Sequence, residues 1–223
     1  MDELSSAAYR ALRRMIEDGE FAMGERLREA RLARKLNFSR TPIRTALNCL
    51  KHDGFLTYEA NRGHIMATYT AAQVFEIYEC RSILESEAVR MACERGPNAE
   101  QIAAIEQLVE DMDAVVEDSE MSGERKRKEF LIINKRFHDY IYAQCGNEHL
   151  LGLIARTSGL PLVIRNYFGF SNVALSKSQE DHRMIARALV NRHAERARAL
   201  TREHIIAACE HMIGDSPSLG AAE

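Results

Sequence analysis

The hydrophobic positions of the first fifty residues recur at helical spacing in three short stretches. These stretches run from about residue 8 to 18, from 30 to 36 and from 39 to 52. Turn-forming residues separate them, and Ser39 suits the N-cap of the third stretch. The inward face of that stretch repeats at i, i+4 and i+7 with Ile43, Leu47 and Leu50. Two short helices joined by about three residues predict a helix-turn-helix.

Two short β-prone runs follow the third stretch. Phe55 to Tyr58 and His64 to Thr68 flank a polar loop over residues 59–63. This pattern predicts a hairpin, which we call the wing. Gly63 would permit the turn and a close approach of the wing tip to a DNA backbone, although the same residues also fit a plain surface hairpin.

From residue 70 onward nearly every segment has helical periodicity, and no β-rich run is present. Turn signals divide this part into about six helices, with breaks at 95–98, 121–123, 146–147 and 166–171. The predicted fold class is mainly α: a winged helix-turn-helix domain and an all-α helical bundle. The expected boundaries are 1–69 for the first domain, 70–213 for the second, and 214–223 for a disordered tail.

Composition restricts the class of protein further. The chain is 46% hydrophobic and 28% charged, which is ordinary for a soluble protein. It contains no run of about 18 apolar residues, and its acidic start is unlike a secretory signal. The five cysteines are scattered and odd in number, which favours reduced thiols. We therefore expect a cytoplasmic protein without a membrane partner.

The charge is distributed unevenly along the chain. Residues 1–70 hold 12 Lys and Arg against 9 Asp and Glu, whereas residues 71–223 hold 18 against 24. Between Arg26 and Arg44 there are seven cations, Arg28 among them, and one anion, Glu29. Such a basic cluster is typical of phosphate binding, although charge alone would also fit a solvated helix.

The second helix of a helix-turn-helix enters the major groove, so its outward face should contact DNA. Opposite the buried stripe lie Thr41, Arg44, Thr45 and Asn48. Arg40 lies one turn before Arg44, where it could reach a phosphate or a guanine. An arginine can donate two hydrogen bonds to O6 and N7 of guanine, and we predict that Arg44 is the main base-reading residue.

Several histidines of the second domain have inward helical phases. Asn134 and His138 are four residues apart beside apolar positions, and His182 and His204 belong to apolar stripes of two later helices. A single core histidine is usually only hydrogen-bonded. Three histidines with an amide in one small bundle favour a metal site.

Arg81 falls within the inward stripe of the helix predicted over residues 71–94. A buried guanidinium needs a partner. It could pair with Glu85 at i+4, or it could bind an anionic ligand in the bundle.

Three motifs in the first domain resemble the signature of the GntR family of transcription regulators. They are Gly24-Glu25-Arg26-Leu27-Arg28-Glu29-Ala30, Ser39-Arg40-Thr41-Pro42-Ile43-Arg44 and Asn61-Arg62-Gly63. The resemblance implies that Arg40, Arg44, the hydroxyls of Ser39 and Thr41, and Gly63 contact operator DNA. It departs at Thr45, where members commonly have an acidic residue, and at Ala30, where some have a base-contacting arginine. The complete set of expected DNA contacts is Arg28, Ser39, Arg40, Thr41, Arg44, Thr45, Asn48, Arg62, Gly63 and His64.

The second domain resembles the FCD effector domain of one GntR subfamily, which includes FadR-like regulators. The matching motifs are Arg81-x-x-x-Glu85, Asn134-x-x-Phe137-His138 followed by Gly146-Asn147, Asp181-His182-Arg183, and His204-Ile205. The resemblance implies that Asn134, His138, His182 and His204 hold a divalent metal, zinc or nickel, and that a carboxylate effector binds beside it with Arg81 as a second anchor. Asn134 stands where aspartate is common, which removes one negative charge and should weaken the site.

The leading hypothesis is a homodimeric repressor of a metabolic operon that is not an enzyme. In this hypothesis a small organic acid shifts the two DNA-binding domains out of register with a palindromic operator. The alternative is a metal-dependent hydrolase using His138 and Asp139, but Asp139 is about 100° round the helix from its neighbour. A helical protein-interaction module would explain the bundle and not the motif from Ser39 to Arg44.

Overall fold

The computed structural model describes residues 2–157 and 171–214, and these fall into two compact units. The first unit extends to Thr70, and the second begins at Ala71. After the winged helix-turn-helix and the helical bundle that the sequence predicts, we call them the DNA-binding unit and the helical unit. No helix among the described residues has the length and apolar character needed to cross a membrane.

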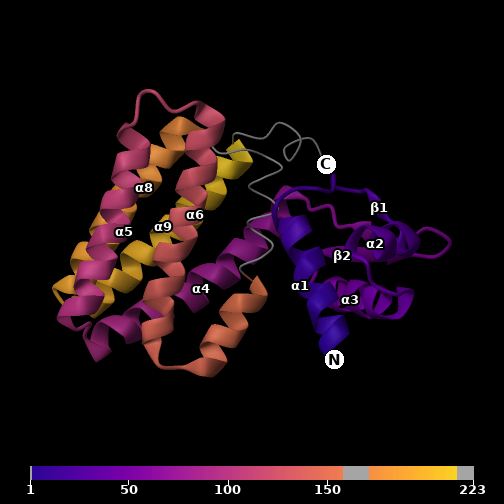
Figure 1. The fold of residues 1–223 in the computed structure, drawn as a ribbon. Helices are drawn as coiled ribbons and strands as arrows, with labels where there is room; N and C mark the ends of the chain where they lie inside the picture. The colour runs from indigo at the N-terminus through magenta and orange to yellow at the C-terminus, as the bar shows by residue number, and fades with distance from the viewer. Residues whose placement is uncertain (1, 158–170, 215–223) are drawn as a thin grey trace. The chain divides into compact units, whose positions relative to one another are not determined.

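Within residues 2–70, the DNA-binding unit contains three helices and a small sheet (Figure 1). The helices are α1 (Glu3–Glu17), α2 (Glu29–Leu36) and α3 (Arg40–His52). Asn37 ends α2 in the left-handed conformation, with φ of 55°, which turns the chain sharply into α3. The apolar faces of α1 and α3 pack together, and the fully buried residues of this core are Ala8, Leu12, Ile43, Ala46, Leu47 and Leu50.

The wing is part of a three-stranded antiparallel sheet with the order β1-β3-β2. β2 (Leu56–Glu59) and β3 (Gly63–Met66) form the predicted hairpin, in which Glu59 pairs with Gly63 at the tip. β1 (Arg26–Leu27) adds a third strand that the sequence pattern did not predict, because two residues are too few to show a period. Gly63 has φ of 79°, a conformation that L side chains rarely adopt.

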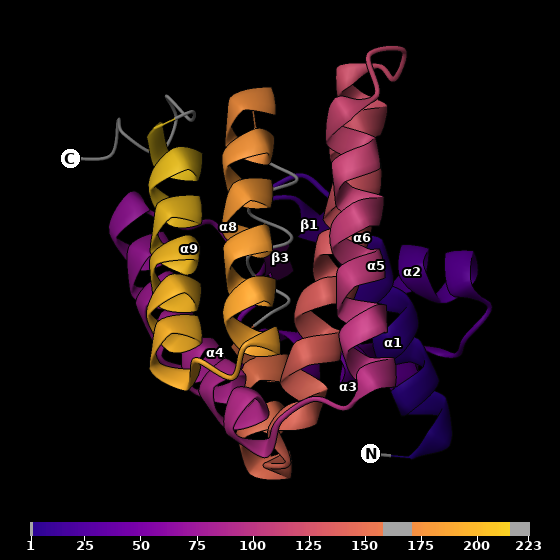
Figure 2. The same ribbon diagram turned by 90° about the vertical axis from the view of Figure 1, so that its left-hand side faces the viewer.

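The described part of the helical unit is all α, as predicted. Its long helices are α4 (Ala71–Arg95), α5 (Ala99–Glu117), α6 (Gly123–Tyr142), α8 (Asn172–Val190) and α9 (Ala194–Gly214). A short 3-10 turn η1 (Ala143–Cys145) and a helical segment over residues 148–157 follow α6. Figure 2 shows α8 and α9 side by side, and α4 packs extensively on α9.

The predicted helix breaks agree with the structure wherever the chain is described. Asn98 caps α5 through a capping box with Gln101, and Gly146 adopts the left-handed conformation after η1. The core between the helices is apolar, with Phe130, Phe137 and Ile105 fully excluded from solvent. The break predicted at 166–170 and the tail predicted beyond Gly214 lie outside the described residues.

Candidate functional site

The outward face of α3 is held in place by the burial of its inward face. Because Pro42, Ile43 and Leu47 are buried, the side chains of the opposite face are directed to solvent. Exposed residues on or beside this face are Ser39, Arg40, Thr41, Arg44 and Asn48, and Thr45 is half-buried. Ser39 occupies the N-cap position, but its side chain makes no capping hydrogen bond. The predicted recognition surface is therefore assembled on a single exposed helix face.

Arg44 is not isolated on this surface. Its Nε donates to both carboxylate oxygens of Glu29, at 3.1 and 3.2 Å, and its Nη2 donates to Oε2 at 3.0 Å. Glu29 is the first residue of α2, so the pair joins the two helices of the helix-turn-helix. The hydrogen bond and the charge of Glu29 raise the pKa of Arg44. Sequence spacing did not predict this contact, because the two residues are fifteen positions apart.

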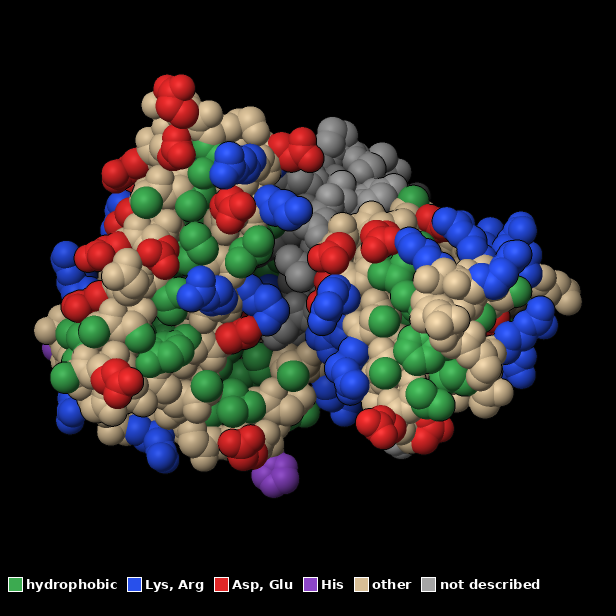
Figure 3. Space-filling view, in the orientation of Figure 1, with side chains coloured by type: hydrophobic (Ala, Val, Ile, Leu, Met, Phe, Trp, Pro, Cys, Tyr) green, Lys and Arg blue, Asp and Glu red, His purple; other side chains and the backbone are tan. Residues whose placement is uncertain are grey.

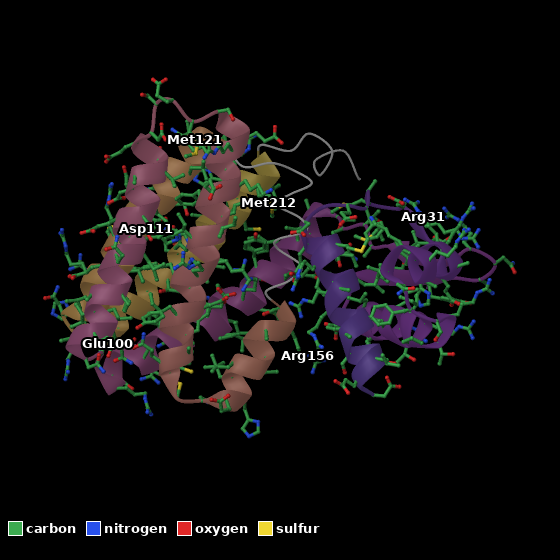
Figure 4. All side chains as sticks on the ribbon, viewed as in Figure 1. Arg31, Glu100, Asp111, Met121, Arg156 and Met212 are labelled. Atoms are coloured by element: carbon green, nitrogen blue, oxygen red, sulfur yellow. The ribbon has the colours of Figure 1, made fainter. Side chains whose placement is uncertain are left out.

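Lys and Arg side chains gather at the end of the DNA-binding unit that carries α2 and the wing (Figure 3). Arg28 is exposed just before α2, and Arg31 projects outward from this end (Figure 4). At the wing tip Arg62 is exposed and pairs with Glu59, with 2.7 Å between Nη1 and Oε2. These positions are accessible to a polyanion.

The structure buries His64, for which the sequence predicts a DNA contact. It is only 4% exposed, and its ring lies edge-on to Tyr58. Its Nε2 lies 3.2 Å from Oδ1 of Asn48, so it links the wing to α3. Burial lowers the pKa of His64 and favours the neutral ring. His64 lies in the central strand of the sheet, paired with Leu27 of β1 and Tyr58 of β2, and is buried with its neighbours Ile65 and Met66, which the isolated motif at the wing tip could not indicate.

Three histidines from three helices converge inside the helical unit. His138 comes from α6, His182 from α8 and His204 from α9, and one ligand atom from each lies within 4.8 Å of the others. Nε2 of His138 is 3.2 Å from Nε2 of His182. His182 and His204 are almost completely buried. The structure thus brings together the histidines that the helical phases selected.

The Nδ1 atom of each histidine faces a polar partner. In His138 this partner is the hydroxyl of Tyr142 at 3.0 Å, in His182 it is Oε1 of Gln179 at 3.2 Å, and in His204 it is Oδ2 of Asp181 at 3.3 Å. Gln179 in turn donates from Nε2 to the carbonyl of Val109 and to Asp113. Ligating histidines in metal sites are typically oriented in this way through the second ring nitrogen.

Two buried polar atoms near this cluster have no hydrogen-bond partner among the described residues: Oδ1 of Asn134 and Nη1 of Arg81. Asn134 lies one turn before His138 on α6 and is 7% exposed. An unsatisfied buried oxygen is costly in a native protein, and a bound water, ligand or ion can supply the partner that it needs. The donor set of one amide oxygen and three imidazoles therefore fits a divalent metal such as zinc or nickel.

A hydrogen-bonded chain connects Arg81 to the histidines. Arg81 donates from Nε to Oε1 of Glu85 at 2.7 Å, and the Tyr142 hydroxyl donates to Oε2 of the same carboxylate at 2.6 Å. That hydroxyl also lies against His138. Burial and then the Glu85 charge raise the pKa of Tyr142 well above its ordinary value, so it remains a neutral donor.

The contacts of Arg81 are compatible with both interpretations given above, an internal pair with Glu85 and the binding of an anionic ligand. Burial, the largest single effect, lowers the pKa of Arg81, but the charge and hydrogen bond of Glu85 together with Tyr78 and Tyr142 outweigh it and raise the pKa above its ordinary value, so the guanidinium stays charged. Its side chain is 12% exposed, and its Cζ lies 4.7 Å from the centre of the Tyr78 ring. The internal pair with Glu85 exists, while Nη1 still has a donor available for a ligand.

A DNA-binding unit with a recognition helix and a wing, joined to a helical unit with a polar buried site, defines a transcription regulator of the winged helix-turn-helix class. Comparison with known proteins agrees. Residues 4–65 match the model of bacterial regulatory proteins of the gntR family, and residues 76–207 match that of the FCD domain. The chain belongs to the GntR family and carries an FCD domain.

Relatives support the same assignment over most of the chain, and a solved structure supports the fold. The chain is 35% identical to the Nta operon transcriptional regulator of Aminobacter aminovorans, over 83% of each protein. It is 26% identical to the HTH-type transcriptional repressor GlaR of Escherichia coli K12, over 89% of this chain and 90% of that protein. Its fold is similar to that of E. coli McbR/YncC, with a TM-score of 0.76, 22% identity, and coverage of 92% and 94% of the two chains.

The chain is a DNA-binding transcription regulator. The families and relatives that it matches are regulators and not enzymes, so the hydrolase alternative has no support. In the structure Asp139 forms an ion pair with Lys135, one turn earlier on the same helix. Some FCD domains bind a metal, and the histidine cluster of this chain has the composition for one.

Proposed function

We propose that this regulator is a homodimeric repressor of a metabolic operon whose operator binding responds to a small organic acid in the helical unit. The observation that carries the proposal is the pair of unsatisfied buried atoms, Asn134 Oδ1 and Arg81 Nη1, beside three converging histidines. One is an acceptor suited to a cation, and the other is a donor suited to a carboxylate.

Asn134, His138, His182 and His204 would hold a divalent metal ion, which supplies a positive charge that attracts a carboxylate. Arg81 would bind the acid through Nη1 while its Nε stays paired with Glu85. Glu85 and Tyr142 would keep the guanidinium and the His138 ring oriented toward the same ligand.

In the DNA-binding unit, α3 would enter the major groove, with Arg44 as the main base-reading residue. Arg40, Thr41, Ser39 and Asn48 would contribute phosphate or base contacts, and the wing with Arg62 and Gly63 would lie along the backbone. Two copies would bind the half-sites of a palindromic operator. An acid that bound the DNA-incompetent arrangement about a hundredfold better would supply ~2.7 kcal/mol of coupling.

The DNA-binding part is tested with a duplex selected by the full-length protein from a random library. Arg44→Ala should weaken binding to that duplex by about 1 to 3 kcal/mol in fluorescence anisotropy, because a bidentate base contact is lost. Wild-type affinity in this variant would show that α3 does not read bases through Arg44.

The metal is tested by elemental analysis of protein purified without chelator or nickel resin. One equivalent per chain is expected in the wild type, and none in the double variant His138→Ala with His182→Ala. Metal that persisted in the double variant would reject the proposed ligands.

A further inference from the structure

The carboxylate of Glu29 faces the helix that is expected to read DNA. It is 28% exposed and is bound by Arg44, whose own side chain is 62% exposed. An anion so near a recognition surface is unexpected on electrostatic grounds, because it repels phosphate. Glu29 is the first residue of α2, and its carboxylate accepts three hydrogen bonds from the guanidinium of Arg44. We therefore expect Glu29 to affect how Arg44 binds DNA.

The contacts with Glu29 use one edge of the Arg44 guanidinium. Nε and one hydrogen of Nη2 are directed to the carboxylate, so the edge formed by Nη1 and Nη2 is the one not used by the pair. Two donors on one edge are what recognition of guanine O6 and N7 requires. The pair thus restrains a long side chain while it preserves an edge for a base.

We propose that Glu29 is a positioning residue for sequence recognition: it holds Arg44 in the orientation that reads a base pair and disfavours contacts of Arg44 with phosphate. The proposal rests on the base-reading role proposed above for Arg44. Ordering one long side chain before binding is worth roughly 2- to 12-fold in affinity, by the usual entropic cost of immobilising it. This gain applies only to the duplex that the oriented guanidinium fits.

Arg40 provides an internal contrast. It lies one turn before Arg44 on the same helix and is exposed, and no ion-pair partner is assigned to it within residues 2–157 and 171–214. An unrestrained arginine adapts to a phosphate at little cost. Among the residues that the structure describes, a carboxylate therefore restrains Arg44 and none is assigned to Arg40.

A second ion pair of the same unit supplies a matched control. Glu20 pairs with Lys35 of α2, and both side chains are about half exposed. Glu29→Gln and Glu20→Gln each add the same net charge to the DNA-binding unit. Both should strengthen binding to a scrambled duplex by a similar factor, because nonspecific binding follows charge.

The test measures, for the full-length protein, the ratio of the dissociation constants for a scrambled duplex and for a duplex selected by the wild type. We expect Glu29→Gln to lower this preference roughly fivefold relative to Glu20→Gln. In an Arg44→Ala background the Glu29 substitution should have no further effect on the preference. An equal preference in the two glutamine variants, or an equal loss with and without Arg44, would overturn the proposal.

The outcomes separate this proposal from the proposed function. If Arg44→Ala loses the preference and Glu29→Gln keeps it, only the role of Glu29 is wrong. If the wild type enriches no sequence, or Arg44→Ala keeps the full preference, the base-reading role fails and the role of Glu29 fails with it. Thermal melts check that the variants fold. If Glu29→Gln is unstable, Glu29→Asp tests the same loss of preference, because its shorter side chain cannot keep the same contacts with Arg44.

Discussion

Tyr142 offers the most direct test of how the helical unit builds its polar site. Its hydroxyl is buried, donates to Glu85 Oε2 at 2.6 Å and lies 3.0 Å from His138 Nδ1. Tyr142→Phe removes both interactions with little change in shape. A hydrogen bond to a buried carboxylate contributes about 1.5–3 kcal/mol, so the variant should lose that much free energy of unfolding. For a domain of this size the loss lowers the melting temperature by roughly 3 to 12 °C.

Tyr78→Phe is the matched control. Tyr78 is also buried in the same unit, but its hydroxyl lies 4.0 Å from the sulfur of Met212 on α9, a weak acceptor. The melting temperatures of Tyr142→Phe and Tyr78→Phe are measured in the presence of a chelator, so that both proteins are metal-free. Their zinc affinities are then measured by competition with a chromophoric chelator. Tyr142→Phe should also weaken zinc binding by about 10- to 100-fold, because His138 loses its orienting partner. A Tyr142→Phe variant as stable as Tyr78→Phe, with unchanged zinc affinity, would refute this reasoning.

Three further predictions concern single residues of the two units. Asn134→Asp should tighten zinc binding by about tenfold or more, because it adds a negative charge to the ligand set. Unchanged zinc affinity in Asn134→Ala would exclude this residue as a ligand. An organic acid that raises the melting temperature of the wild type should not raise that of Arg81→Ala, and an equal rise in both would assign the acid to another site. His64 has a lowered pKa, so its contribution to stability is present above its ordinary pKa of 6.5 and is lost as the pH falls through the folded value. Chemical denaturation should therefore show a steeper loss of stability in the wild type than in His64→Gln as the pH falls below the ordinary pKa of His64; parallel curves would contradict the assignment.

The sequence was sufficient for the parts of the fold that depend on local periodicity. The recognition helix, the hairpin and the long helices of the second unit all follow from hydrophobic spacing and turn residues. The inward histidines could be selected for the same reason, because helical phase determines which side chains share a face. Their convergence needed only that the helices pack as one bundle.

The features that were missed depend on contacts between distant segments. β1 is a two-residue strand defined by its partner β3, and Glu29 meets Arg44 only because α2 and α3 fold against each other. Tyr142 meets Glu85 across 57 positions, which no local pattern encodes. The burial of His64 likewise depends on the register of the sheet.

The central claim is that ligand binding in the helical unit controls DNA binding, and one titration tests it most directly. The dissociation constant of the full-length protein for its selected duplex is measured with and without an organic acid that stabilises the wild type in a thermal-shift screen. The account predicts a change of about tenfold or more at saturating acid, and no change in Arg81→Ala. An acid that stabilises the protein through Arg81 and leaves the wild-type dissociation constant unchanged would contradict it.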